Sequence, residues 1–239
     1  MPLHDLKAWK PLAESLRGKR WGYCQSPANV GDKLIARGTF RVLGHYGIEF
    51  VNWHGPDTEC DGLLMSGGGN LGTKYPACAR YRWLILETAK EKELPVVVLP
   101  QTASDKVDLG ERVTVWLREH VSARYYPKGK FAHDLSLAFD PGALPEAKLD
   151  VGVYLRRDGE ARFKDMPSEG DPAVKCITPE DYCWLAARYR EIVTDRLHFA
   201  IAGLLAGRKV TLLPCNYHKS RSVWEASLKE LGCLWREEP

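Results

Sequence analysis

The stretch Ile192-Val193-Thr194-Asp195-Arg196-Leu197-His198 joins a short apolar run to a helical pattern of small residues, Phe199-Ala200-Ile201-Ala202-Gly203. An apolar run that ends in charged residues and continues into a helix is typical of a strand-to-helix turn in an α/β sheet. A helix N-terminus presents free N–H groups, and Arg196 adds a bidentate fork for carboxylate or phosphate. His198 is able to donate or accept a proton near neutral pH. The turn predicts an anion site, although a solvated arginine with Asp195 as a helix cap explains the same pattern.

Short apolar runs alternate with helical patterns on both sides of this turn, which predicts an α/β protein. In the first part of the chain the expected strands are 20–25, 48–53, 62–65, 96–99, 123–126 and 135–139, and the expected helices are 32–46, 77–93 and 109–120. In the second part the expected strands are 151–155, 174–177, 192–194 and 210–213, and the expected helices are 179–190, 197–206 and 221–231.

A turn-rich segment, Asp140-Pro141-Gly142-Ala143-Leu144-Pro145-Glu146, separates the two parts. Turn residues between two periodic regions indicate a linker, so we expect domains at 1–145 and 146–239. The polar segment 157–171 is expected to be an exposed loop. The prediction is two Rossmann-like halves, the second one short, with a ligand cleft between them at the carboxyl ends of the strands.

Composition excludes several classes of protein. The chain of 239 residues has a formal net charge of only +3, which does not favour a nucleic-acid partner. It contains no apolar run long enough to span a membrane, and its first residues lack the apolar core of a signal peptide, so we expect a cytoplasmic protein. Seven cysteines without a CxxC pair argue against a disulfide framework. Cys215 and His218 have the spacing of half a zinc site, but no second pair completes it and no metal is expected.

Two glycine-bearing segments follow expected strands in the first half. Asn29-Val30-Gly31-Asp32-Lys33-Leu34-Ile35 places a glycine where backbone can approach a ligand, and Asp32 at a helix start can cap the helix or accept from a sugar hydroxyl. Gly67-Gly68-Gly69-Asn70-Leu71-Gly72 allows successive N–H groups to bind an anion or a hydroxyl. It is not in frame with the dinucleotide-binding GxGxxG pattern, so that interpretation is weak.

Three further polar groups follow strands. Leu99-Pro100-Gln101-Thr102 places a polar pair after a buried strand, and Arg156-Arg157 follows the first strand of the second half. Asn216-Tyr217-His218-Lys219-Ser220 follows the last strand, with Ser220 expected to cap the final helix.

In their order and spacing, these motifs resemble those of the polysaccharide pyruvyl transferase family. The resemblance runs from about residue 20 to 233, and it rests on the N-x-G-D-x-L-I segment 29–35, the G-G-G-N loop 67–70, Pro100-Gln101, Arg156, the R-L-H triplet 196–198 and the late Lys219. It implies a fold like the GT-B glycosyltransferases. It also implies transfer of pyruvate from phosphoenolpyruvate to a sugar of a polysaccharide or its precursor, with a ketal as the product.

The resemblance further implies roles for individual residues. The side that binds phosphoenolpyruvate comprises Arg156, Arg196, Leu197, His198 and Lys219, and the side that faces the acceptor sugar comprises Asn29, Gly31, Asp32, Gly68, Gly69, Asn70 and Gln101. Phosphoenolpyruvate is a substrate, and no cofactor is expected. The acceptor is a sugar or lipid-linked saccharide, which leaves peripheral association with a membrane open.

The chemistry needs an acid near C3 of the enol and a base near the acceptor hydroxyl. We assign the acid to His198, and Asp32 and Asp195 are the base candidates, with Asp195 expected to orient Arg196 instead. The arginine pair and the helix N-terminus can stabilise the developing charge without a metal.

Two alternatives stay open from the sequence alone. A GT-B glycosyltransferase would place the diphosphate of a nucleotide sugar on Arg196 and the following helix. A non-catalytic sugar- or anion-binding module fits the short second half, because the family usually has more helix between the Arg156 strand and the R-L-H strand.

We expect three tryptophans to be exposed, where they would stack on sugars or fill interfaces: Trp53, Trp184 and Trp235. The sequence does not predict the oligomeric state.

Overall fold

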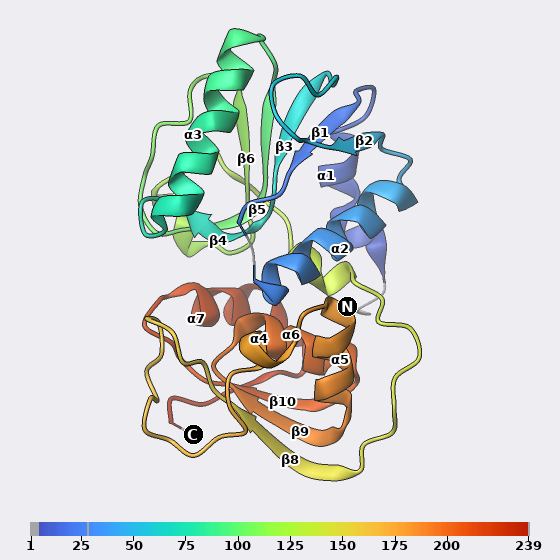
Figure 1. Ribbon diagram of the computed structural model, residues 1–239, viewed down its shortest axis with the longest axis vertical. Helices are drawn as coiled ribbons and strands as arrows, with labels where there is room; N and C mark the ends of the chain where they lie inside the picture. The colour runs from blue at the N-terminus through green and yellow to red at the C-terminus, as the bar shows by residue number, and fades with distance from the viewer. Residues whose placement is uncertain (1–4, 28, 239) are drawn as a thin grey trace.

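The computed structural model describes residues 5–27 and 29–238, and Figure 1 shows two α/β halves, one above the other. All strand pairs of both halves run parallel. The prediction of two Rossmann-like halves is therefore confirmed. The expected boundary between residues 145 and 146 falls between the last strand of the first sheet and the first strand of the second.

The first sheet has the order β2-β1-β3-β5-β6-β7, with β4 added beside β5. Its strands are β1 (Trp21–Cys24), β2 (Phe50–Asn52), β3 (Gly62–Met65), β4 (Gly68–Leu71), β5 (Val96–Ala103), β6 (Val113–Leu117) and β7 (Lys130–Phe131). Its helices are the 3₁₀ helix η1 (Leu6–Trp9), α1 (Lys10–Glu14), α2 (Val30–His45), α3 (Pro76–Glu91) and the 3₁₀ helices η2 (Val121–Arg124) and η3 (Leu135–Ala138).

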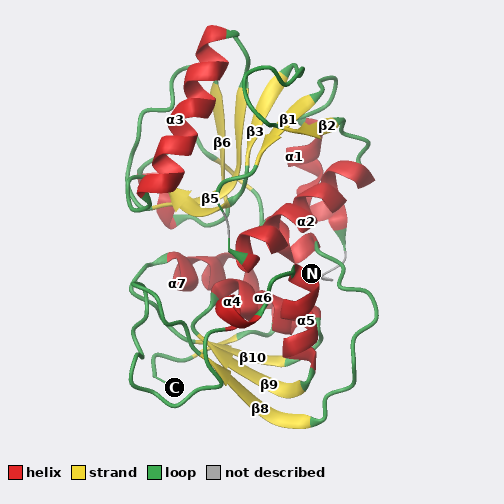
Figure 2. Cartoon of the chain, viewed as in Figure 1, coloured by secondary structure: helices red, strands yellow, loops and turns green. Residues whose placement is uncertain are grey.

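Alternation along the strands explains why helices cover both faces of this sheet. In β3, Leu64 packs in the same core as Leu34 of α2, whereas Leu63 packs in a second core with Ile85 of α3. Successive side chains of a strand point to opposite faces, so an all-apolar strand needs cover on both sides. Figure 2 shows α3 on one side of the sheet and α1 and α2 on the other.

The second sheet has the order β11-β10-β9-β8. Its strands are β8 (Leu149–Tyr154), β9 (Tyr189–Thr194), β10 (Lys209–Leu212) and β11 (Leu234–Trp235). Its helices are α4 (Pro172–Lys175), α5 (Pro179–Ala187), α6 (Leu197–Leu205) and α7 (Lys219–Val223), which continues as a π turn over Trp224–Leu228 and a 3₁₀ turn over Lys229–Leu231. Figures 1 and 2 show these helices between their sheet and the first half.

The two halves share one hydrophobic core. Leu34 and Leu43 of α2 belong to the same buried cluster as Tyr182 of α5 and Phe199 of α6. At Gly38 of α2 a β-carbon would overlap the carbonyl oxygen of Leu135, so the absence of a side chain lets α2 pack closely on η3. This packing sets the N-terminus of α2 against the N-terminus of α6.

Several sequence predictions were wrong. The expected helix 109–120 contains strand β6, because the β-branched residues Val113, Thr114 and Val115 extend the sheet next to β5. The expected strand 123–126 is part of the 3₁₀ helix η2. The expected strand 135–139 is η3, because Asp134 caps that turn by accepting from the N–H of Ser136. The expected strand 174–177 overlaps α4, which Asp171 caps.

Other predictions differed from the structure in where an element ends or in whether a side chain is exposed. Helix α5 ends at Ala187 because β9 already begins at Tyr189, and β5 extends through the Pro100-Gln101 pair that was expected to follow it. The glycine segment after β3 is the short strand β4 rather than a free loop. Trp53 was expected to be exposed but is buried against Tyr81, whereas Trp184 is exposed and Trp235 is half-buried.

Candidate active site

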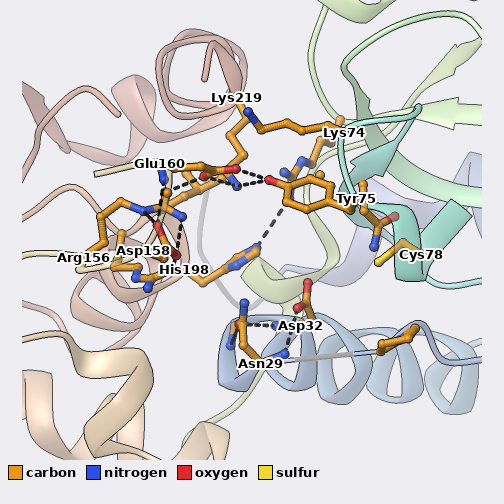
Figure 3. A pocket seen from close by; sticks show the side chains of 18 of the residues that line it. Asn29, Asp32, Lys74, Tyr75, Cys78, Arg156, Asp158, Glu160, His198 and Lys219 are labelled. Atoms are coloured by element: carbon orange, nitrogen blue, oxygen red, sulfur yellow. Dashed lines mark hydrogen bonds and ion pairs between the residues drawn. The ribbon is translucent and has the colours of Figure 1, made fainter. Parts of the chain in front are cut away.

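A cavity of about 470 Å³ lies between the two halves, and residues that follow strands of both sheets line it. Figure 3 shows the charged side chains of the second half facing those of Asn29, Asp32, Tyr75 and Cys78 of the first half. The lining residues are Pro27, Asn29, Gly31, Asp32, Gly69, Asn70, Lys74, Tyr75, Cys78, Arg118, Arg156, Asp158, Gly159, Glu160, Tyr182, Arg196, Leu197, His198 and Lys219.

Arg196 is the residue before the first turn of α6, two positions after the end of β9, and two carboxylates hold its guanidinium. Its Nε donates to Oδ1 of Asp171 over 2.9 Å, and Nη2 bonds the other oxygen of the same carboxylate. Its Nη1 lies 2.9 Å from Oδ2 of Asp158. Bidentate pairing fixes the plane of a guanidinium as well as its position. Arg196 is therefore held with its charge directed into the cavity, at a helix N-terminus that already favours anions.

Arg156 follows β8 and lies beside Arg196. Its Nε and Nη2 donate to the two carboxylate oxygens of Asp158 over 2.8 and 2.9 Å, and its Nη1 lies 2.6 Å from Oε2 of Glu160. Burial would lower the pKa of Arg156, but these carboxylates raise it above its usual value. The two arginines thus form a fixed pair of cations in one wall of the cavity.

Lys219, at the start of α7, joins the same wall and reaches across the cleft. Its Nζ lies 2.8 Å from Oε2 of Glu160 and donates to the hydroxyl of Tyr75, in the first half, over 3.4 Å. The Tyr75 hydroxyl also donates to Glu160. Burial lowers the pKa of Lys219 despite its carboxylate partner. For Glu160 burial acts to raise the pKa, but the charges of Lys219 and Arg156 lower it below its usual value, so this carboxylate stays ionised.

His198 lies in the first turn of α6, where it meets residues of the first half. Its Nε2 lies 3.4 Å from Nη1 of Arg118 and 3.7 Å from Oδ2 of Asp134. A β-carbon on Gly31 would lie 2.5 Å from Nδ1 of His198, so the imidazole packs directly on the backbone of α2. The position of the ring therefore depends on the contact between the halves.

Arg118 and Asp134 form an ion pair of 2.6 Å with both side chains 1% exposed. Arg118 also donates from Nε to Thr102 over 2.9 Å. Burial would raise the pKa of Asp134, but the Arg118 guanidinium lowers it far below its usual range. A buried pair with further hydrogen bonds is the arrangement that offsets the cost of desolvating two charges. The pair gives His198 a rigid, charged neighbour.

The N-terminus of α2 forms the opposite wall. Asn29 caps the helix, because its Oδ1 accepts from the N–H groups of Gly31 and Asp32 over 2.7 and 3.4 Å, and Oδ2 of Asp32 accepts from the N–H of Asn29 over 3.0 Å. This capping box satisfies donors that the helix cannot pair internally. The side chain of Asn29 is therefore engaged by the helix, and the other oxygen of Asp32 points toward the position where Gly68 would carry a β-carbon, 3.6 Å away.

Gln101 does not line the cavity, but it hydrogen-bonds Asn70, which does. It is buried, its Nε2 donates to the carbonyl of Ser66 over 2.7 Å and to Oδ1 of Asn70 over 3.0 Å, and its Oε1 accepts from the N–H of Asn70 over 3.2 Å. The geometry gives Gln101 the task of orienting Asn70. Gly68 likewise is not among the lining residues, whereas Gly69 and Asn70 are.

The cavity thus brings together ten of the site residues expected from the sequence: Asn29, Gly31, Asp32, Gly69, Asn70, Arg156, Arg196, Leu197, His198 and Lys219.

Asp195 was expected to orient Arg196 but is buried behind it. Its Oδ1 accepts from the N–H of Arg156 over 2.8 Å, and its Oδ2 has no hydrogen-bond partner among the described residues. Burial raises the pKa of Asp195 to about 6. Ser220 was expected to cap the last helix but lies inside α7, where no side chain caps the N-terminus.

The sequence interpretation missed the carboxylates Asp158, Glu160 and Asp171, the cross-cleft residues Lys74 and Tyr75, and the pair Arg118 and Asp134. Arg118 directly follows β6, so the rule that placed Arg156 and Arg196 would have found it had the strand been recognised. The three carboxylates all lie in the segment 157–171, which was expected to be an exposed loop. No signal in the sequence indicates that this segment folds back onto the arginines.

Two parallel sheets with a cleft between them, which five basic side chains line, define an α/β protein whose site offers partners for an anionic substrate. A family model described as polysaccharide pyruvyl transferase matches residues 29–217. Because that match covers well over half of the chain, the protein belongs to the polysaccharide pyruvyl transferase family and is a transferase.

The fold is similar to that in the crystal structure of a functionally uncharacterised protein from Klebsiella pneumoniae subsp. pneumoniae, with a TM-score of 0.74, 20% sequence identity and 99% of each chain covered. At that identity the similarity concerns the fold alone. A comparison with curated proteins finds no match.

Proposed function

We propose that this protein transfers the pyruvyl group of phosphoenolpyruvate to two hydroxyls of a sugar, in a polysaccharide or its precursor, and releases phosphate. The observation that carries the proposal is the convergence of Arg156, Arg196 and Lys219 on the cavity that His198 also lines. Phosphoenolpyruvate presents a carboxylate and a phosphate, and planar guanidinium forks match both groups. Family membership supports the same donor class.

The reaction moves two protons and exchanges two bonds at C2 of the donor. Protonation of C3 makes C2 electrophilic, the first sugar hydroxyl forms a C–O bond to C2, and the second hydroxyl forms another as the C–O bond to phosphate breaks. One hydroxyl proton balances the proton delivered to C3, and the other leaves with phosphate. The two arginines stabilise the negative charge that collects on the departing phosphate.

In this scheme His198 delivers the proton to C3. The Arg118–Asp134 pair and the backbone of Gly31 hold its ring, which suits a group that must act in one orientation. Asp32 is the base candidate, because among the described residues its Oδ1 accepts no protein hydrogen bond, whereas Oδ2 is occupied by the N–H of Asn29. Buried Asp195 does not line the cavity and is not proposed as a base.

The acceptor enters from the side of α2 and β4. Asn70 and Asp32 offer donors and acceptors for sugar hydroxyls there. In the described part of the chain no helix is both long and apolar enough to cross a bilayer. A lipid-linked acceptor would bring the protein to a membrane surface, where the exposed side chains of Val174 and Ile177, at the end of α4 and next to α2, would meet the lipid.

The test is to incubate the protein with phosphoenolpyruvate and a panel of free, nucleotide-linked and lipid-linked sugars, measuring phosphate release and the ketal by mass spectrometry. We expect phosphate release that depends on one class of acceptor and matches ketal formation mole for mole. Release of a nucleoside diphosphate from a nucleotide sugar, with phosphoenolpyruvate untouched, would instead identify a glycosyltransferase. Binding of phosphoenolpyruvate without release for any acceptor would indicate a binding module.

A further inference from the structure

Asp158 already occupies the space between the two arginines of the cavity. Its carboxylate receives the bidentate fork of Arg156, at 2.8 and 2.9 Å, and its Oδ2 lies 2.9 Å from Nη1 of Arg196. A carboxylate held by three guanidinium nitrogens from two arginines is the arrangement that an acidic substrate would be expected to adopt there. The chain itself supplies that carboxylate.

The charges around the cavity are balanced without any ligand. Five cations line it: Lys74, Arg118, Arg156, Arg196 and Lys219. Five carboxylates face or pair with them: Asp32, Asp134, Asp158, Glu160 and Asp171. A donor with up to three negative charges would leave this region strongly anionic, at a cost that rises as water is excluded. Binding of such a donor is therefore favoured if one of the carboxylates leaves.

Exposure and anchoring single out Asp158 as the group able to leave. Its side chain is 43% exposed, whereas those of Glu160 and Asp171 are 7% and 3% exposed. Asp171 caps α4 by accepting from the N–H of Ala173. The carboxylate of Glu160 lies 2.8 Å from Nζ of Lys219 and accepts from the hydroxyl of Tyr75. These anchors tie both residues to the fold.

Asp158 lies in a turn outside any helix or strand. It precedes Gly159, at which a β-carbon would meet nothing within 4 Å. Its Oδ1 also accepts from the N–H of Glu160, two positions on in the same turn, and its carbonyl accepts from the N–H of Ala161 over 3.0 Å, a backbone bond that leaves the side chain free to rotate. Rotation of one exposed side chain is therefore enough to clear the space between the arginines.

We propose that Asp158 is an internal counter-ion, which fills the donor's anion site in the empty protein and moves into solvent when the donor binds. The identity of the donor rests on the proposed function, but the counter-ion role does not. A competing internal group reduces the apparent affinity of every anion by the same factor, the fraction of molecules in which the site is free. Asp158 thereby keeps small anions off the arginines, and it stabilises the arginine pair while the site is empty.

The experiment compares Asp158→Asn with the wild type by calorimetric titration of phosphoenolpyruvate and, separately, inorganic phosphate. The variant should bind both anions roughly ten-fold more tightly, the factor for a site occupied by its own counter-ion about nine-tenths of the time. Asp150→Asn is the matched control, because it removes the same charge from strand β8 at an ion pair with Arg190 whose side chains are 82% and 71% exposed. The control should bind both anions as the wild type does.

Thermal unfolding supplies a second readout, and Asp158→Ser a second variant. Without a ligand both Asp158 variants should melt below the wild type, because two neighbouring arginines lose a counter-ion, and added phosphate should raise their Tm more than it raises that of the wild type. Unchanged or weaker binding of both anions would overturn the counter-ion role. Tighter binding of phosphate, with no binding of phosphoenolpyruvate by any form, would preserve that role and remove the proposed donor.

Discussion

Gly31 is the position at which one added carbon tests the contact between the halves. A β-carbon there would lie 2.5 Å from Nδ1 of His198 and 3.0 Å from both Cβ and Cγ, whereas ordinary contacts begin near 3.4 Å. Because Cβ and Cγ are too close as well as Nδ1, rotation of the imidazole alone does not remove the overlap. His198 must retreat by roughly 1 Å, the difference between 2.5 Å and an ordinary contact of 3.4 Å. A displacement of that size typically costs about 100-fold in rate.

Gly31→Ala should therefore lower the rate of phosphate release from phosphoenolpyruvate by about 100-fold. Its effect on stability should be small, because alanine favours a helix by up to about 1 kcal/mol and this partly offsets the strain. Gly44→Ala is the matched control on the same helix, since a β-carbon there meets nothing within 4 Å. We expect the control to keep full activity and to be at least as stable in urea. Full activity in Gly31→Ala would refute the view that the α2 backbone positions His198.

Two further predictions concern His198 of α6 and Asp195, which lies two positions before that helix. His198→Gln keeps a hydrogen-bond donor but supplies no proton, so turnover at saturating substrate should fall by about 100-fold or more while donor binding is retained; a rise in KM alone would make His198 a binding residue. Burial raises the pKa of Asp195 from 3.8 to about 6. Between these pH values the folded state binds more protons than the unfolded state, so the free energy of unfolding falls as pH rises, by about 3 kcal/mol in total. Asp195→Asn should remove that fall when urea unfolding is measured from pH 4 to 7, and an unchanged pH profile would show that Asp195 is not its source.

The parts of the site that the sequence predicted share one property, which is that each follows a strand of clear apolar character. Arg156 and Arg196 follow β8 and β9, and the carboxyl ends of parallel strands gather at one edge of a sheet. The same rule failed at Arg118, because charged residues on both sides of Val113–Leu117 gave that strand the appearance of an amphipathic helix. The error lay in one element, and it concealed the cation that contacts His198.

The carboxylates could not have been predicted in the same way. Asp158 and Glu160 lie in a polar segment without periodicity, and their pairing with Arg156 and Lys219 depends on how the chain folds back over the sheet. Asp134 has a local signal, the cap of η3, but its ion pair with Arg118 is a tertiary contact. Patterns of sequence indicate elements and the ends of strands, whereas the balance of charge in the cleft emerges only from packing.

The proposed function depends on the binding of phosphoenolpyruvate by the arginine pair. Calorimetric titration with this donor tests it most directly, comparing the wild type with Arg196→Lys and with the control Arg190→Lys, whose ion pair on β9 is exposed. The wild type and the control should bind equally. Arg196→Lys should bind about 10- to 100-fold more weakly, because lysine keeps the charge but not the planar guanidinium that Asp171 orients, and a charge-assisted hydrogen bond is worth about 1.5–3 kcal/mol. Equal affinity in all three proteins, or no binding to the wild type, would contradict the account.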